Sequence, residues 1–217
     1  MRDDPYPPIN ARLLLEAYAS GVFPMADGAE ANEIFWVDPK ARGIIPLDGL
    51  TVSRSLRKRL RRDDYQVTIN RRFVDIVQAC ADREETWINA EIQSLYHDLY
   101  RGGYAHSIEV WMGDELAGGL YGVALGGAFF GESMFSRRTD ASKIALVWLV
   151  ARLRAGGFTL LDTQFVTEHL ERLGAIEIPR GVYHRRLEQA LIQPADFWRL
   201  PVKTDTQLVL QLSTQMS

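Results

Sequence analysis

The chain has 217 residues, of which 47% are hydrophobic and 24% are charged, and its net charge is −3. This length supports one main domain with a sizeable core and a small appendage. The lone Cys80 excludes an intramolecular disulfide and a multi-cysteine zinc site, which favours a reducing compartment. No apolar run approaches the roughly 18 residues of a membrane span, and Met1–Pro5 shows no signal segment. We therefore expect a soluble, cytoplasmic protein that does not enter membranes.

The first fifty residues predict one helix and two short extended segments. Asn10 suits the N-cap and Gly21 the C-terminal end of a helix over residues 11–20. Residues 34–37 and 44–47 resemble short strands. We therefore expect a small N-terminal α+β domain over residues 1–50 and a larger domain over residues 51–217.

A concentrated basic segment opens the larger domain. Six of the nine residues from Arg54 to Arg62 are basic. Leu56 and Leu60, four residues apart, predict a helix that turns them inward and leaves the cations mostly on one side. Such a run is often only a solvated face. Here the charge is dense and lacks interleaved acids, so the helix repels itself unless phosphate offsets it, and we favour nucleic-acid contact.

The remaining segments mix helices with mostly antiparallel strands, which indicates an α+β fold with a mixed sheet. Gly113-Asp114 and Gly126-Gly127 mark the turns between three adjacent strands. The predicted strands cover residues 65–69, 106–112, 116–125, 128–135 and 158–165, and the predicted helices cover residues 73–81, 88–100, 141–155, 168–173 and 183–191.

Two polar constellations interrupt apolar strands. Glu132 follows Phe129 and Phe130, so its carboxylate needs either a ligand or a structural salt bridge. Asp162 and Gln164 are two residues apart, which places both side chains on one face of a strand. The alternative for this pair is a strand end that turns toward solvent.

Several chemistries lack their motifs. The four histidines form no metal-ligand pattern, and neither a G-x-S-x-G elbow nor a phosphate-binding P-loop is present. We expect no metal, no cofactor and no covalent acyl-enzyme.

Nine stretches, in order over roughly residues 10–190, resemble the bacterial leucyl/phenylalanyl-tRNA–protein transferases. They are Gly21–Pro24, Ser53–Ser55, Thr86–Ile88, Ala105–Trp111, Gly118–Val123, Gly131–Ser136, Ala141–Lys143, Leu161–Gln164 and Leu173–Arg180. The family often has Trp where this chain has Met25. The departure softens an aromatic contact to the terminal adenosine, although Met still packs on a ring.

The resemblance implies an N-acetyltransferase-like (GNAT-like) larger domain beside the small N-terminal domain. It implies transfer of leucine or phenylalanine, with methionine as a further donor, from aminoacyl-tRNA to proteins that begin with Arg or Lys, which marks them for N-end-rule degradation. It also implies a monomer, with tRNA contacts at Arg54, Lys58, Arg61 and Arg62. The aminoacyl-adenosine and side-chain pocket is assigned to Met25, Trp87, Leu120, Phe129, Gly131, Leu149 and Leu153, and the catalytic residues are Glu132, Asp162 and Gln164.

The donor ester is already activated, so alignment of the acceptor amine is the main task. An amide is not a base. We therefore expect Gln164 to hold the amine, Asp162 to orient Gln164 or accept a proton through it, and Glu132 to hold the adenosine or the acceptor. One alternative is an acyl-CoA N-acyltransferase, but the loop before residue 141 has no glycine and carries Asp140, which repels phosphate. The other alternative is a non-catalytic tRNA-binding module.

Overall fold

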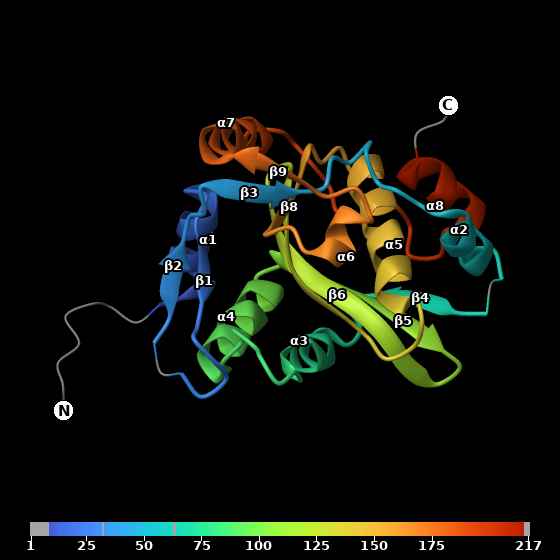
Figure 1. Cartoon of the computed structure of the whole chain (residues 1–217), viewed down its shortest axis with the longest axis horizontal. Coiled ribbons are helices and arrows are strands. Elements are labelled where there is room, and N and C mark those ends of the chain that lie inside the picture. Colours follow the sequence, from blue (N-terminus) through green and yellow to red (C-terminus); the bar gives the residue numbers. More distant parts are fainter. Residues whose placement is uncertain (1–8, 32, 63, 215–217) are drawn as a thin grey trace.

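A seven-stranded mixed sheet organises the computed structural model, which describes residues 9–31, 33–62 and 64–214 (Figure 1). The segment Met1–Pro5 lies outside the described residues. The β7–β8 pair is parallel and the other described pairs are antiparallel, which confirms the predicted mixed α+β fold. The strand order is β4 (Gln66–Ile69), β5 (Ala105–Met112), β6 (Glu115–Leu125), β7 (Ala128–Ser136), β8 (Leu160–Gln164), β3 (Ala41–Ile44) and β9 (Ile176–Pro179).

Strands β5, β6 and β7 form the three antiparallel strands predicted from the turn glycines. Gly113 and Gly126 have φ values of 62° and 55° in these turns, a region that L side chains rarely adopt. At Gly126 a Cβ atom would also lie 2.4 Å from the Leu191 carbonyl oxygen. Gly126 is therefore required both for the turn and for the close approach of Leu191, the last residue of α7.

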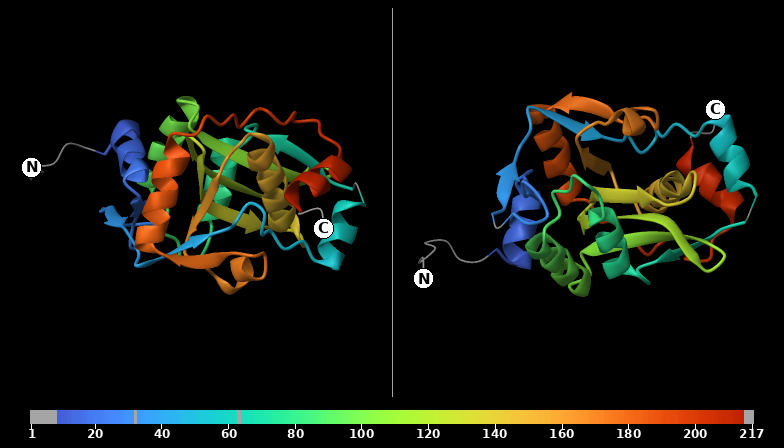
Figure 2. Two further views of the ribbon diagram at one scale, coloured as in Figure 1. Left: turned by 90° about the horizontal axis from the view of Figure 1, so that it is seen from above. Right: turned by 60° about the horizontal axis from the view of Figure 1, so that its bottom comes forward.

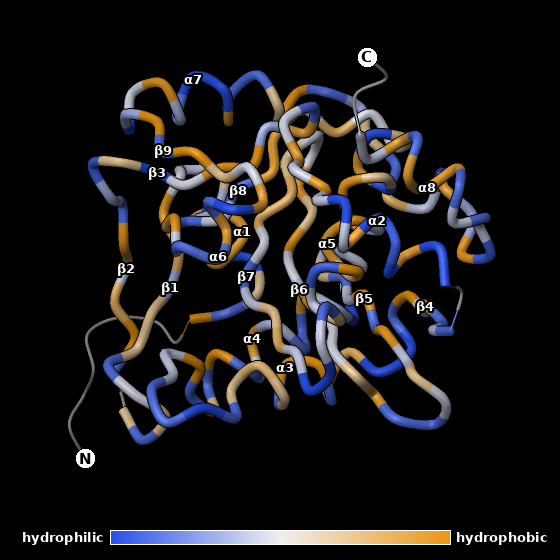
Figure 3. The backbone as a smooth tube through the Cα atoms, turned by 45° about the vertical axis from the view of Figure 1, so that its right-hand side comes forward, coloured by the Kyte–Doolittle hydropathy of each residue, from blue (hydrophilic) through white to orange (hydrophobic). Residues whose placement is uncertain are grey.

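Helices cover both faces of this sheet (Figures 1 and 2). One apolar layer lies under α2 (Arg54–Leu60), α5 (Ala141–Ala155) and α8 (Thr206–Ser213). The opposite layer lies under α1 (Ala11–Ala19), α3 (Phe73–Ala81), α4 (Ala90–Arg101) and α7 (Arg180–Leu191). Most of the α5 side chains are buried, whereas Figure 3 shows hydrophilic residues along α7 at the edge of the molecule.

The N-terminal segment contributes to the main core. β1 (Phe23–Met25) and β2 (Phe35–Val37) pair as a separate hairpin-like sheet, but Leu14, Tyr18 and Phe23 join the buried cluster of α3 and α4. The strand expected at residues 44–47 overlaps β3 only at Ile44, because β3 covers Ala41–Ile44 and ends two residues before Pro46. β1, β9 and α8 were not expected from the sequence. The domain boundary at residue 50 stays a prediction.

The segment after α7 is fixed to α5 by a buried cation and to β5 by ring stacking. Arg152 on α5 is fully buried and donates to the carbonyl oxygens of Phe197 and Leu200 at 2.8 and 2.7 Å. The Phe197 ring stacks on His106 of β5 with 4.0 Å between centroids. None of the described helices is long and apolar enough to cross a membrane.

Candidate functional site

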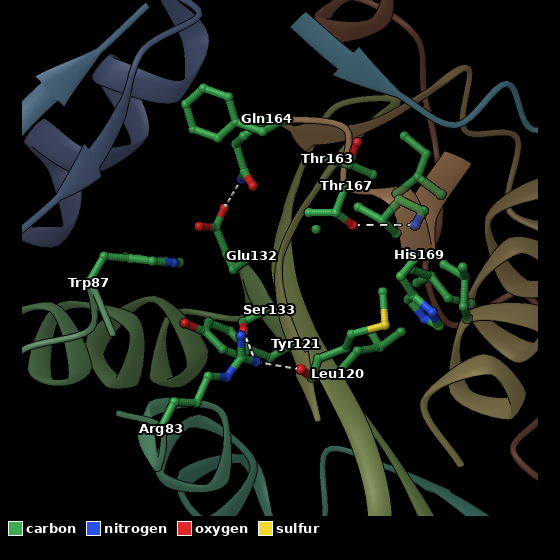
Figure 4. Close-up of a pocket in the computed structure, with 17 residues that line it drawn as sticks. Arg83, Trp87, Leu120, Tyr121, Glu132, Ser133, Thr163, Gln164, Thr167 and His169 are labelled. Carbon is green, nitrogen blue, oxygen red and sulfur yellow. Dashed lines mark hydrogen bonds between the residues drawn. The ribbon is translucent and has the colours of Figure 1, made fainter. Parts of the chain in front are cut away.

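A pocket opens where the two parallel strands of the sheet separate. β7 and β8 pair over Ala128–Phe130 and Leu160–Asp162, and beyond these residues they diverge. The cavity between them has a volume of about 340 Å³. α5, the short helix α6 (Glu168–Glu171) and the segment between α3 and α4 close its sides (Figure 4).

Most of the pocket wall is apolar. Of the side chains expected there, Leu120 and Leu149 line the cavity, as do Trp87 and Gly131. Apolar neighbours that the sequence did not single out also line the cavity, namely Met134, Leu146, Leu161, Phe165 and Leu170.

Three residues expected in the pocket lie elsewhere. Phe129 and Leu153 are fully buried in the core and do not line the cavity. Met25 is half-buried on β1, also outside the lining. Their assignment to substrate binding stays a prediction. Under that prediction, these three residues would influence the substrate through the neighbouring residues that line the cavity.

The polar side of the pocket centres on Glu132, which is 7% exposed. Its Oε1 accepts hydrogen bonds from the Tyr18 hydroxyl at 2.8 Å and the Gln164 amide at 3.1 Å. Its Oε2 accepts from the Tyr96 hydroxyl at 2.6 Å. Helices α1 and α4 thus deliver two phenols to one carboxyl on β7. The end of β8 delivers the Gln164 amide to the same carboxyl (Figure 4).

The environment of Glu132 brings its proton equilibrium close to neutrality. Burial raises the pKa of this carboxyl to about 7, and the negative charge of Asp162 adds to the shift, while the two tyrosine hydroxyls and Arg42 oppose it. Burial also raises the pKa of Tyr18 and Tyr96 well above the usual value, so both phenols remain protonated donors. Glu132 can therefore gain or lose a proton near neutral pH.

Asp162 lies behind the pocket rather than in it. Its carboxylate is fully buried and accepts from Arg42 Nε at 2.9 Å and Nη2 at 2.6 Å. It also accepts from the Tyr183 hydroxyl and from the Gln164 backbone N–H, both at 2.9 Å. Two of these four bonds come from the Arg42 guanidinium, so Asp162 and Arg42 form a buried ion pair.

The same-face geometry expected for Asp162 and Gln164 is interrupted at the end of β8. Gln164 has a φ of 59°, which breaks the alternation of the strand. Its amide consequently faces Glu132 while Asp162 faces Arg42. The structure brings Glu132 and Gln164 together at the cavity and joins Asp162 to them through the Gln164 backbone.

Arg42 is the main residue that the sequence reading missed. Its guanidinium is 1% exposed and lies between the rings of Phe23 and Tyr183, 4.5 and 4.4 Å from the centroids. It also donates to the Gly21 carbonyl at 2.9 Å. Arg42 stands 120 residues before Asp162, so no local pattern could have paired them.

The basic segment forms α2, as expected. Ser53 caps the helix by accepting from the Leu56 N–H, and Leu56 and Leu60 are buried. Arg54, Lys58, Arg61 and Arg62 are all exposed. α2 lies beside α5 and α8, at the end of the molecule away from α1 (Figure 1).

Comparison with known proteins identifies the family to which the chain is similar. Residues 44–188 match the family model described as leucyl/phenylalanyl-tRNA protein transferase, and residues 8–40 match the model of its N-terminal domain. A leucyl/phenylalanyl-tRNA–protein transferase of Ruegeria sp. strain TM1040 is 63% identical, covering 96% of this chain and 99% of that protein. One from Cereibacter sphaeroides strain ATCC 17025 is 60% identical, covering 97% and 99%.

A third relative, from Phenylobacterium zucineum strain HLK1, is 56% identical and covers 96% of this chain and 98% of that protein. Among solved structures, a conserved protein of unknown function from Bacteroides thetaiotaomicron covers 85% of this chain and 71% of its own at 12% identity, with a TM-score of 0.35. That score is too low to equate the two folds. The full-length relatives and both family models establish that the chain belongs to the leucyl/phenylalanyl-tRNA–protein transferase family.

Proposed function

We propose that this chain transfers leucine or phenylalanine, with methionine as a further donor, from aminoacyl-tRNA to proteins that begin with Arg or Lys. The observation that carries the proposal is the apolar cavity of about 340 Å³ that opens directly beside the buried pair of Glu132 and Gln164. A cavity of this character accepts an unbranched or γ-branched apolar side chain and rejects an unpaired charge. Leucine, phenylalanine and methionine share that chemistry.

The transferred side chain would lie against the leucines of α5 and β6, with Leu120 and Leu149 in the wall. Trp87 at the other side of the cavity offers a ring on which the terminal adenine stacks. A Cβ at Gly131 would lie 3.3 Å from the Asp162 carbonyl oxygen, so the glycine permits the close approach of β7 and β8 beside the pocket. The ester of the donor would then sit near Glu132 and Gln164.

Gln164 is oriented for the acceptor amine by its bond to Glu132. Because its amide nitrogen donates to Glu132, its carbonyl oxygen remains to accept from the α-amine. The amine attacks the ester carbonyl carbon, so the new C–N bond forms as the ester C–O bond breaks and the 3′-oxygen of the tRNA leaves. The attacking amine must lose a proton, which Glu132, with a pKa of about 7, is placed to take and to pass to the departing 3′-oxygen. Asp162 acts as a positioning residue that holds the Gln164 backbone.

The proposal also covers the fold of the larger domain, the type of donor, and the location and partners of the protein. The parting of β7 and β8 beside a substrate pocket is the feature on which we base a GNAT-like larger domain. The start of α5 argues against acyl-CoA, because Asp140 stands at the N-cap and would repel pyrophosphate. We further propose a cytoplasmic monomer that binds tRNA through Arg54, Lys58, Arg61 and Arg62, needs no metal or other cofactor, and marks its products for N-end-rule degradation.

The deciding experiment measures transfer of labelled leucine from Leu-tRNA to a protein with N-terminal Arg. Matched reactions use Leu-CoA as donor, a protein with N-terminal Asp as acceptor, and Asp-tRNA or Lys-tRNA as charged donors. We expect product only with the apolar aminoacyl-tRNA and the basic N-terminus. Equal transfer from Leu-CoA would favour the acyl-CoA alternative, and tRNA binding without any transfer would favour a non-catalytic module.

A further inference from the structure

The segment that carries Trp87 has little regular structure to hold it. It runs from Asp82, where α3 ends, to Asn89, the N-cap of α4. Within it the Arg83 N–H donates to the Ala81 carbonyl, and the Ile88 N–H donates to the Thr86 hydroxyl at 3.2 Å. Glu84 and Glu85 are exposed, whereas Arg83 and Trp87 line the pocket.

The Arg83 side chain joins this segment to the pocket strand. Its Nη2 donates to the Ser133 hydroxyl at 2.9 Å and to the Met134 carbonyl at 2.5 Å, both on β7 (Figure 4). Ser133 directly follows Glu132, and both residues line the cavity. The bridge therefore links the strand of the catalytic carboxyl to the segment of Trp87, from the side of the cavity opposite α5 and α6.

We propose that Arg83 is a positioning residue that fixes the Asp82–Asn89 segment on β7 and so holds Trp87 ready for the terminal adenosine. This inference rests on the function proposed above. Without the bridge the segment samples other conformations, and apparent affinity falls in proportion to the competent fraction. Losing one charge-assisted bridge at an exposed site lowers that fraction about fivefold to tenfold.

Binding of a non-hydrolysable 3′-amide analogue of leucyl-adenosine tests the proposal. We expect Arg83→Ala to raise the dissociation constant about fivefold to tenfold, with a matching rise in KM for Leu-tRNA and little change in kcat. Arg83→Lys should recover part of the loss, because an ammonium can reach one of the two acceptors. Arg12→Ala is the matched control, since Arg12 is exposed and pairs with Glu16 on α1.

A double-mutant cycle with Trp87→Ala separates positioning from direct contact. If Arg83 acts through Trp87, Arg83→Ala adds nothing to the loss already caused by Trp87→Ala. Additive losses, or a lowered salt slope of tRNA binding in Arg83→Ala, would mean that Arg83 touches the substrate itself and would overturn the proposal. An unchanged dissociation constant in Arg83→Ala would also overturn it.

The cycle also distinguishes this inference from the proposed function. If Trp87→Ala leaves analogue binding intact, the adenosine site assigned to Trp87 is wrong, and the positioning role of Arg83 is wrong with it. If Trp87→Ala weakens binding and Arg83→Ala does not, the adenosine site stands and the positioning role alone is wrong. Thermal unfolding of each variant verifies that the measured protein is folded.

Discussion

At the scale of single residues, the buried carboxyl of Glu132 gives the protein a defined pH response. Its pKa is raised from 4.5 to about 7 by burial, so between these pH values the folded state keeps a proton that the unfolded state has released. The free energy of unfolding contributed by this group therefore falls as pH rises through that window. The whole effect amounts to about 3 kcal/mol as an upper estimate.

We predict that Glu132→Gln removes this pH dependence. Glutamine cannot titrate, so the stability advantage of the wild type over the variant should shrink by up to about 3 kcal/mol from pH 4.5 to pH 7.5. Denaturant unfolding of both proteins at a series of pH values measures the difference. Two parallel stability curves would mean that Glu132 does not titrate in this range.

Asp162 and Gln164 should respond differently to mutation, although both belong to the proposed catalytic centre. Asp162→Asn leaves the Arg42 guanidinium buried beside a neutral amide, so we predict a loss of about 3–5 kcal/mol in stability together with lower turnover. Gln164→Ala removes one bond to Glu132, so we predict a stability loss of only about 1 kcal/mol and at least about tenfold lower turnover.

Single-turnover transfer with saturating Leu-tRNA, beside tRNA filter binding and thermal unfolding, measures these effects. Because the two residues act as a unit, the double variant should turn over little more slowly than the worse single variant. tRNA affinity should stay close to that of the wild type in each. If Gln164→Ala keeps the wild-type turnover, the acceptor amine is not bound by Gln164 on β8, and Glu132 becomes the next candidate for that role.

At this scale the sequence could reveal a site residue only where a polar side chain interrupts an otherwise apolar strand. Glu132 and Gln164 stand out in that way, and the structure brings their side chains together. Tyr18, Tyr96 and Arg42 carry no such signal, because each lies at an ordinary position and meets its partner across 36 to 120 residues of chain. The left-handed turn at Gln164 was equally invisible, since non-glycine residues seldom adopt it.

At the scale of elements, α2 is the proposed tRNA contact. Arg54 and Lys58 are exposed on α2, and Arg61 and Arg62 are exposed directly after its end, whereas Arg59 pairs with Asp64. We predict that reversing these four cations to Glu weakens tRNA binding and lowers the log–log salt slope by about 0.7–0.9 for each lost phosphate contact. Filter binding over a range of salt concentrations measures both changes.

Two comparisons make this test specific. Arg12→Glu, on exposed α1, should leave the salt slope unchanged. The α2 variant should keep its thermal stability, because its buried Leu56 and Leu60 are untouched. A salt slope equal to that of the wild type would rule out α2 as the phosphate-binding element.

Elements with strong local signals were predictable, and those fixed by distant contacts were not. α2 follows from two leucines four residues apart, and the β5–β7 strands follow from their turn glycines. β9 has four residues, three of them exposed, and becomes a strand because β3 pairs with it. β3 itself lies between β8 and β9, a position decided by pairings more than 100 residues away.

At the scale of the whole molecule, the N-terminal segment and the larger sheet share one core. β3 hydrogen-bonds to both β8 and β9, and the Arg42 side chain on β3 is buried against Asp162. Tyr18 of α1 donates a hydrogen bond to Glu132 on β7 of the sheet. Two sequence units are recognisable in the family models, yet the contacts between them include the proposed catalytic centre.

We therefore predict that the chain unfolds in one cooperative transition. Separating residues 9–50 from the sheet would expose Leu14, Tyr18 and Phe23 and would leave Asp162 without its cation, so neither part is stable alone. Calorimetry should give a calorimetric enthalpy equal to the van't Hoff enthalpy. A fragment of residues 51–217 should lack a cooperative transition even in the presence of the leucyl-adenosine amide analogue. Two separate transitions in the full chain, or a cooperatively folded fragment, would show that the segment before residue 50 is an independent domain.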